Sequence, residues 1–171
     1  MNAWELFKRY PEVAGVFGEL REKNREGYRA ACRLTLTRRK MRPAFLEKKP
    51  LAERFVWLAA EMGRATNEDL AAEVLQSWLT QCRNEMLVSF LDELGVPHDG
   101  KGLIESLPEE PPIERLNRAV ALLLERWPRW EVLVYLNLFC KMDIACWSGL
   151  REITDRLTNT EVAATTEAAG S

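Results

Sequence analysis

The only histidine in the chain lies in a glycine-rich segment that also contains carboxylates. His98 belongs to residues 95–102, Gly-Val-Pro-His-Asp-Gly-Lys-Gly, and Asp92, Glu93 and Asp99 are its acidic neighbours in sequence. Carboxylates beside an imidazole can hold a metal ion or allow the ring to act as a general base. The Asp-Gly pair that begins at Asp99 is also typical of a tight turn, because glycine supplies a positive φ. The pattern predicts a turn, with a site made of these four residues as the alternative.

A basic stretch is the second candidate for chemistry. Residues 38–49 carry a net charge of +5, with Glu47 as their one acidic residue. Together with the arginine that precedes them, the candidate anion-binding residues are Arg33, Arg38, Arg39, Lys40, Arg42, Lys48 and Lys49. Basic residues further upstream have acidic neighbours at helical spacing, whereas those after Arg33 have none. We therefore expect the later cations to be unpaired.

Unpaired cations at this density suit three roles. They can contact the phosphates of a nucleic acid, dock on an acidic protein surface, or form a solvated loop. Phe45 is the one aromatic residue in the stretch that could stack on a base, and no known nucleic-acid motif accompanies it. The sequence leaves all three roles open.

Tryptophan is the third candidate, because the chain contains six. Trp57 and Trp130 fit the apolar stripes of their predicted helices less well than the other tryptophans, so their side chains are expected at the surface. An exposed tryptophan on a helix is a typical anchor of a protein interface. The alternative is a second buried face, as in a helix packed between two others.

Enzyme signatures are absent from the sequence. It contains no glycine-rich phosphate loop, no His-Glu-x-x-His and no Gly-x-Ser-x-Gly motif, and a single histidine rules out most catalytic triads within one protomer. The four cysteines, at positions 32, 82, 140 and 146, form no Cys-x-x-Cys pair, so we expect free thiols and no zinc site. No cofactor is expected.

Charge is unevenly distributed along the chain. Residues 1–64 contain 15 basic and 8 acidic residues, a balance of +7, whereas residues 65–171 contain 9 and 18, a balance of −9. Such a division predicts either a surface for an acidic partner or two complementary faces, which would meet within one fold or between copies of it.

Apolar residues recur at steps of three and four along most of the chain, which predicts an all-α fold of seven to eight helices in antiparallel hairpins, an irregular bundle or a short helical-repeat array. The expected helices cover residues 2–10, 13–31, 50–62, 66–82, 84–94, 111–127, 130–142 and 143–157. Residues 34–37 alternate like a strand, and the 18-residue connection 95–112 is long enough to be functional. Thr66 and Asp69 are spaced as a capping box.

A weak internal repeat accompanies these helices. Residues 75–82 align with residues 120–127 at an offset of 45, and residues 86–88 align with 132–134 at an offset of 46. Periods of this length are typical of two-helix repeats, and chance matching of apolar residues is the alternative.

The predicted organisation is a single helical domain over residues 1–157, with a basic part (1–64) and an acidic, repeat-like part (65–157). Val162 is the only large apolar residue after 157, so residues 158–171 are expected to form a disordered tail. No signal peptide and no apolar stretch of about 20 residues is present, which favours a cytoplasmic protein that does not enter a membrane.

These observations favour a non-catalytic module for protein–protein interaction or scaffolding, with a protein partner or a second copy of itself. The first alternative is a nucleic-acid-associated protein that uses residues 33–49. The second is an enzyme or metal protein centred on His98.

Overall fold

The computed structural model describes residues 1–141 and 147–169, with side chains up to residue 160. The predicted all-α class is confirmed, because the described residues form ten α-helices and two short 3-10 helices and contain no strand. In chain order the elements are α1 (Ala3–Arg9), η1 (Pro11–Gly15), α2 (Val16–Lys23), α3 (Arg25–Arg38), α4 (Ala44–Glu47), α5 (Leu51–Met62), η2 (Ala65–Asn67), α6 (Glu68–Cys82), α7 (Asn84–Leu94), α8 (Ile113–Arg126), α9 (Arg129–Phe139) and α10 (Ser148–Ala169).

The chain divides into two compact units, an N-terminal unit (Met1–Asn84) and a C-terminal unit (Glu85–Ser171). This boundary falls 20 residues after the change from basic to acidic composition at residue 64. A compact unit is not by itself an independently folding domain. The expectation of one cooperative domain over residues 1–157 therefore stays a prediction.

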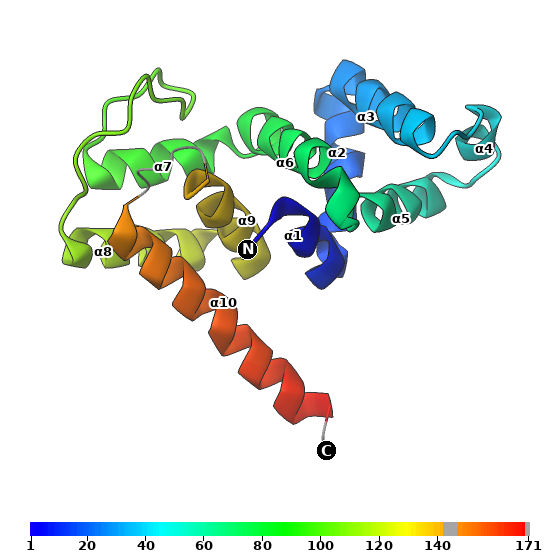
Figure 1. Ribbon diagram of the computed structural model, residues 1–171. Helices are drawn as coiled ribbons and strands as arrows, with labels where there is room; N and C mark the ends of the chain where they lie inside the picture. The colour runs from blue at the N-terminus through cyan, green and yellow to red at the C-terminus, as the bar shows by residue number, and fades with distance from the viewer. Residues whose placement is uncertain (142–146, 170–171) are drawn as a thin grey trace. The chain divides into compact units, whose positions relative to one another are not determined.

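The core of the N-terminal unit forms where α1 and α2 pack against α5 and α6. Its largest fully buried side chains include Phe17 from α2, Met62 from α5 and Trp78 from α6. The apolar stripe of α6 predicts Trp78 on the core face of that helix, and this is confirmed. The short helix α4 lies between α3 and α5 along the chain, outside this core (Figure 1).

Two departures raise the number of helices above the predicted seven to eight. The helix expected over residues 13–31 is two helices, because Asn24 ends α2 and caps α3. The Asn24 Oδ1 atom accepts a hydrogen bond from the Gly27 amide (3.0 Å), and its Nδ2 donates to Ser77 Oγ on α6 (3.1 Å). The second departure is α4, a single turn in a region where the sequence pattern is ambiguous. Residues 34–37 continue α3 rather than forming a strand.

The C-terminal unit is built around α9, which the sequence predicts to be a buried helix. Every residue from Glu131 to Phe139 is buried, as expected from a segment that is apolar on almost all sides. An aromatic cluster joins the helices: Phe90 of α7 contacts Tyr135 and Phe139 at centroid distances of 5.4 and 5.7 Å, edge to face. Burial raises the pKa of the Tyr135 hydroxyl far above its usual range.

The end of the chain is helical in the structure, since α10 extends to Ala169. Asn159 and Thr160 are exposed, and a helix with little apolar surface to bury is marginal in water. The predicted disorder of residues 158–171, like the predicted repeat, therefore stays a prediction. The predicted start of the last helix at Asp143 lies outside the described residues. No helix in the described part of the chain is long and apolar enough to cross a membrane.

The break at Asn24 yields a test of the fold. Replacing Asn24 with alanine removes the cap of α3, so the free energy of unfolding should fall by about 1 kcal/mol in urea denaturation. Ser77→Ala removes only the hydrogen bond to α6 and should cost less. Equal stability of Asn24→Ala and the unmodified chain would show that the cap does not hold this break.

Candidate functional site

The connection between α7 and α8 contains the predicted turn. Gly95 ends α7 with a φ of +64°, the left-handed conformation that glycine adopts most easily. Beyond it, Asp99 Oδ1 accepts hydrogen bonds from the amides of Lys101 (2.8 Å) and Leu103 (3.0 Å). These hydrogen bonds stabilise the carboxylate and lower the pKa of Asp99. The carboxylate of Asp99 therefore shapes the loop.

Both ring nitrogens of His98 form hydrogen bonds. Its Nδ1 accepts a hydrogen bond from the Gly100 amide (3.0 Å), so this nitrogen carries no proton. The proton of the neutral ring then lies on Nε2, which donates to Asp92 Oδ1 at 3.0 Å. Neither nitrogen has a free lone pair for a metal ion or for a substrate proton. The arrangement is that of a clamp which fastens the loop to α7.

The four residues of the predicted His98 site have separate roles. Only Asp92 binds the imidazole, while the carboxylate of Glu93 lies 4.0 Å from Arg118 of α8. Among the described residues, no group of three or more histidine, cysteine or acidic side chains is placed to hold a metal ion.

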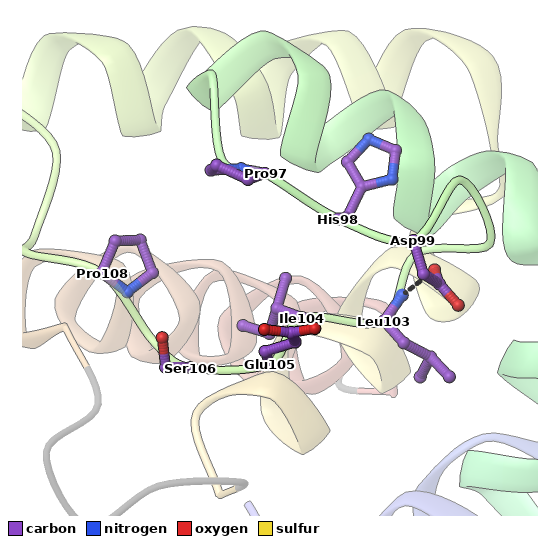
Figure 2. A pocket seen from close by; sticks show the side chains of 8 residues that line it. All are labelled: Pro97, His98, Asp99, Leu103, Ile104, Glu105, Ser106 and Pro108. Atoms are coloured by element: carbon purple, nitrogen blue, oxygen red, sulfur yellow. Dashed lines mark hydrogen bonds between the residues drawn. The ribbon is translucent and has the colours of Figure 1, made fainter.

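A cavity of about 510 Å³ lies along this loop, and its walls come from two segments of the same connection, residues 97–99 and 103–108. Figure 2 shows the imidazole of His98 turned away from Glu105 and Ser106 on the opposite segment. The lining residues are Pro97, His98, Asp99, Leu103, Ile104, Glu105, Ser106 and Pro108. Among the lining side chains, that of His98 is engaged by Asp92 of α7 and by the Gly100 amide, and that of Asp99 by the amides of Lys101 and Leu103.

The expectation that the cations after Arg33 are unpaired is wrong for the first two. Arg38 forms a two-fold ion pair with Asp69 of α6, at 2.6 and 2.9 Å, and also donates to the side chain of Asn67 at 3.1 Å. Arg39 lies 3.2 Å from the carboxylate of Glu61, a buried residue of α5. These partners are about 20 to 30 positions away in sequence, so helical spacing could not identify them.

The same contacts overturn the capping box predicted at the start of α6. The residue at the cap position is Asn67, and its side chain makes no capping hydrogen bond. Its Nδ2 donates instead to the carbonyl of Glu61 at 2.8 Å. Asp69 is paired with Arg38, and this pairing lowers the pKa of its carboxyl group to about 2. A tertiary ion pair has replaced the local cap.

Most of the remaining cations of the basic stretch are available to bind an anionic partner. Within the described part of the chain, the exposed side chains of Arg33, Lys40, Arg42 and Lys48 contact no hydrogen-bond acceptor or acidic group. The ammonium group of Lys49 lies over the ring of Phe45, 5.0 Å from its centroid.

The aromatic residues of α4 and α5 lie together. Trp57 is half-buried, and its ring meets that of Phe45 at a centroid distance of 5.2 Å. Arg54 fixes the two helices to each other, because its guanidinium donates to the carbonyls of Lys49 (2.7 Å) and Glu47 (2.9 Å). The short helix therefore has a defined position on α5.

Next to Trp57, the side chain of Val56 is 64% exposed, the most exposed large apolar residue of the described chain. Sequence reasoning missed it, although its position beside the apolar stripe of α5 was a usable signal. We call the group formed by Arg42, Phe45, Lys48, Lys49, Val56 and Trp57 the α4–α5 surface.

Trp130 lies in the other unit, at the start of α9, and is half-buried. Its role as an interface residue stays a prediction.

Cys32 and Cys82 are free thiols in environments that disfavour the reactive thiolate. Burial raises the pKa of both, and a raised pKa lowers the fraction of thiolate at neutral pH. Cys140 is half-buried, and Cys146 lies outside the described residues.

The Arg38–Asp69 pair predicts a dependence of stability on pH. The pKa of Asp69 is lowered from 3.8 to about 2, so the pair stabilises the fold above pH 4 and this contribution is lost as the pH falls towards 2. Because the pair is exposed, Asp69→Asn should cost about 0.5–1 kcal/mol at neutral pH. Urea denaturation should show this difference vanishing near pH 2. A difference that is independent of pH would exclude the ion pair as its source.

The His98 clamp predicts a local effect. His98→Ala removes two hydrogen bonds, so the amides of residues 100–103 should exchange faster with solvent, while the free energy of unfolding falls by about 1 kcal/mol. Lys101→Ala, at an exposed side chain of the same loop, serves as the control. Unchanged exchange in the His98→Ala variant would contradict the clamp.

Comparison with models of known protein families, with curated proteins and with solved structures gave no match to this chain. Its fold class and its candidate surfaces therefore rest on its own residues and geometry.

Proposed function

We propose that this protein is a non-catalytic helical module that binds another protein through the α4–α5 surface. The observation that carries the proposal is the exposure of Val56 beside the half-buried Trp57, whose ring contacts Phe45 edge to face. Aromatic and aliphatic side chains at the centre of a surface, with arginine and lysine around them, are the composition of a protein interface. Arg42, Lys48 and Lys49 supply that cationic surround.

The rigidity of this surface supports a binding role. Arg54 donates to the carbonyl of Glu47 in α4 and to that of Lys49 just after it, and the ring of Phe45 contacts both Trp57 and the Lys49 ammonium group. A surface that is already ordered loses little conformational entropy when a partner binds. The partner that fits combines acidic groups with an apolar contact for Val56.

A nucleic acid fits this surface less well. Arg38 and Arg39 are paired with Asp69 and Glu61, which leaves fewer cations for phosphates than the sequence suggested. An exposed valine gains most from contact with another apolar side chain, and a phosphate backbone does not provide one. Nucleic-acid binding is therefore an outcome that the experiment must be able to detect.

The His98 alternative is the weakest of the three, because both ring nitrogens are engaged by the loop and by Asp92. The loop cavity then has no evident general base or metal ligand of the kind that a catalytic site would need.

Photo-crosslinking inside the cells that make the protein tests the proposal. A photoreactive amino acid at position 56 should give a covalent adduct with a protein, whereas the same amino acid at the exposed Gln76 of α6 should not. Adding Arg42→Glu and Lys48→Glu to the chain labelled at position 56 should lower the adduct yield several-fold, because the partner is acidic.

The adduct also distinguishes the alternatives. An adduct whose added mass is removed by nuclease would assign the surface to nucleic acid. Absence of an adduct at position 56, or equal yields at positions 56 and 76, would overturn the proposal.

A further inference from the structure

We propose that the partner of the α4–α5 surface is a second copy of this chain, which presents the acidic segment 105–114 of its C-terminal unit. This inference rests on the function proposed above and names the occupant of the same surface. The α4–α5 surface and segment 105–114 are both exposed, and their charges are opposite in sign.

The acidic segment has the sequence Glu-Ser-Leu-Pro-Glu-Glu-Pro-Pro-Ile-Glu and a net charge of −4, with no lysine or arginine. One of its carboxylates has a structural role, because Glu110 accepts hydrogen bonds from Ser148 Oγ (3.1 Å) and the Gly149 amide (2.6 Å) at the start of α10. The other three, on Glu105, Glu109 and Glu114, are exposed and make no hydrogen bond or ion pair within the described chain.

The acidic segment is held in place rather than freely moving. Three prolines restrict its backbone, and the carbonyl of Pro108 accepts a hydrogen bond from the Trp147 indole at 3.0 Å. The hydrogen bonds of Glu110 fix the segment a second time. Both members of the proposed contact are thus ordered before they meet, which lowers the entropic cost of association.

The two surfaces match in charge and in apolar character. The basic stretch offers Lys40, Arg42 and Lys48 as available cations, and the acidic segment offers three available carboxylates. The side chain of Ile113, which is 41% exposed, supplies an apolar contact of the kind that Val56 requires. Opposite charges around apolar centres fix the pairing and accelerate encounter.

The symmetry of the contact follows from this chemistry. Like surfaces repel each other, so the basic surface of one copy must meet the acidic segment of another. If the two copies exchange this contact reciprocally, a two-fold axis relates the two contacts and closes a dimer; any other rotation gives a larger ring or an open chain.

A charge exchange between copies tests the inference. Variant X carries Arg42→Glu and Lys48→Glu, and variant Y carries Glu105→Lys and Glu109→Lys. Glu114 is left unchanged, because a lysine in the first turn of α8 would oppose the helix dipole. In X the α4–α5 surface becomes acidic, and in Y the acidic segment has no net charge left, so each variant alone has lost the charge attraction between its two surfaces and should be monomeric in sedimentation velocity.

An equimolar mixture of X and Y should associate again, because the unmodified acidic segment of X then meets the unmodified α4–α5 surface of Y. The unmodified chain should associate at about 0.05 M salt and at least tenfold more weakly at about 0.5 M salt. Two controls reverse the same number of exposed charges elsewhere, Arg25→Glu with Arg29→Glu and Glu125→Lys with Glu152→Lys. Both controls should associate like the unmodified chain.

Several results would overturn the inference: an unmodified chain that stays monomeric at low salt, association of X or Y alone at the normal strength, or a mixture of X and Y that remains monomeric. The same contact made within one chain would be insensitive to mixing, so the mixture excludes it. The crosslink at position 56 separates the two proposals. An adduct with a different protein would leave the binding function standing and remove self-association, whereas the absence of any adduct would remove both.

Discussion

The buried carboxylate of Glu61 is the constraint on which the α4–α5 surface depends. Its side chain is only 5% exposed, and it lies 3.2 Å from the guanidinium groups of both Arg39 and Arg64. Its Oε2 makes no contact of hydrogen-bond geometry, so charge attraction rather than a directed hydrogen bond holds the two arginines. A charge buried in this way is costly unless it is paired, since removal of a partner from a buried pair costs about 3–5 kcal/mol. The chain must therefore bring the end of α3 to the end of α5.

That requirement organises the neighbouring residues. Asn67 donates to the Glu61 carbonyl and accepts from Arg38, while Arg38 also binds Asp69. The network thus ties α3, α5 and α6 together through side chains whose partners are far apart in sequence. The segment that follows α3 is left with a fixed starting point. From there it turns through Lys40, whose φ of +53° is unusual for a residue other than glycine, and reaches α4.

The elements of the fold were predictable where the cause lies within a few residues. The apolar segment that begins at Val132 indicated a buried helix, and Gly95 indicated a left-handed helix end, because neighbouring residues alone determine both features. The turn at Asp99 has the same local origin. The break at Asn24 also has a local cap, because Asn24 accepts a hydrogen bond from the Gly27 amide three residues later. The apolar spacing continues across it, however, and therefore predicted one helix where there are two.

The candidate site was predictable to a smaller extent for the same reason. The residue types were identified correctly, but their availability depends on tertiary contacts. Arg38 and Arg39 are engaged by residues of α5 and α6, and the two nitrogens of His98 are engaged by Asp92 and a backbone amide. Val56 became a candidate only when the packing of α5 showed which side of the helix remains uncovered.

The two units carry opposite net charges, and the internal ion pairs determine which of these charges remain available to a partner. The N-terminal unit contains 16 basic and 11 acidic residues, and the C-terminal unit contains 8 and 15. In the basic stretch, Arg38 and Arg39 already have carboxylate partners, so what remains available is a short group at α4. In the acidic segment only Glu110 is engaged in holding the fold together.

Like charges that are left close together repel each other, at a cost that salt reduces and that a complementary surface removes. Val56 belongs to the α4–α5 surface and Ile113 precedes Glu114 in the acidic segment, so the same contact would cover both exposed apolar side chains. Electrostatics would then select the partner and its orientation, while burial of the apolar side chains would supply most of the affinity.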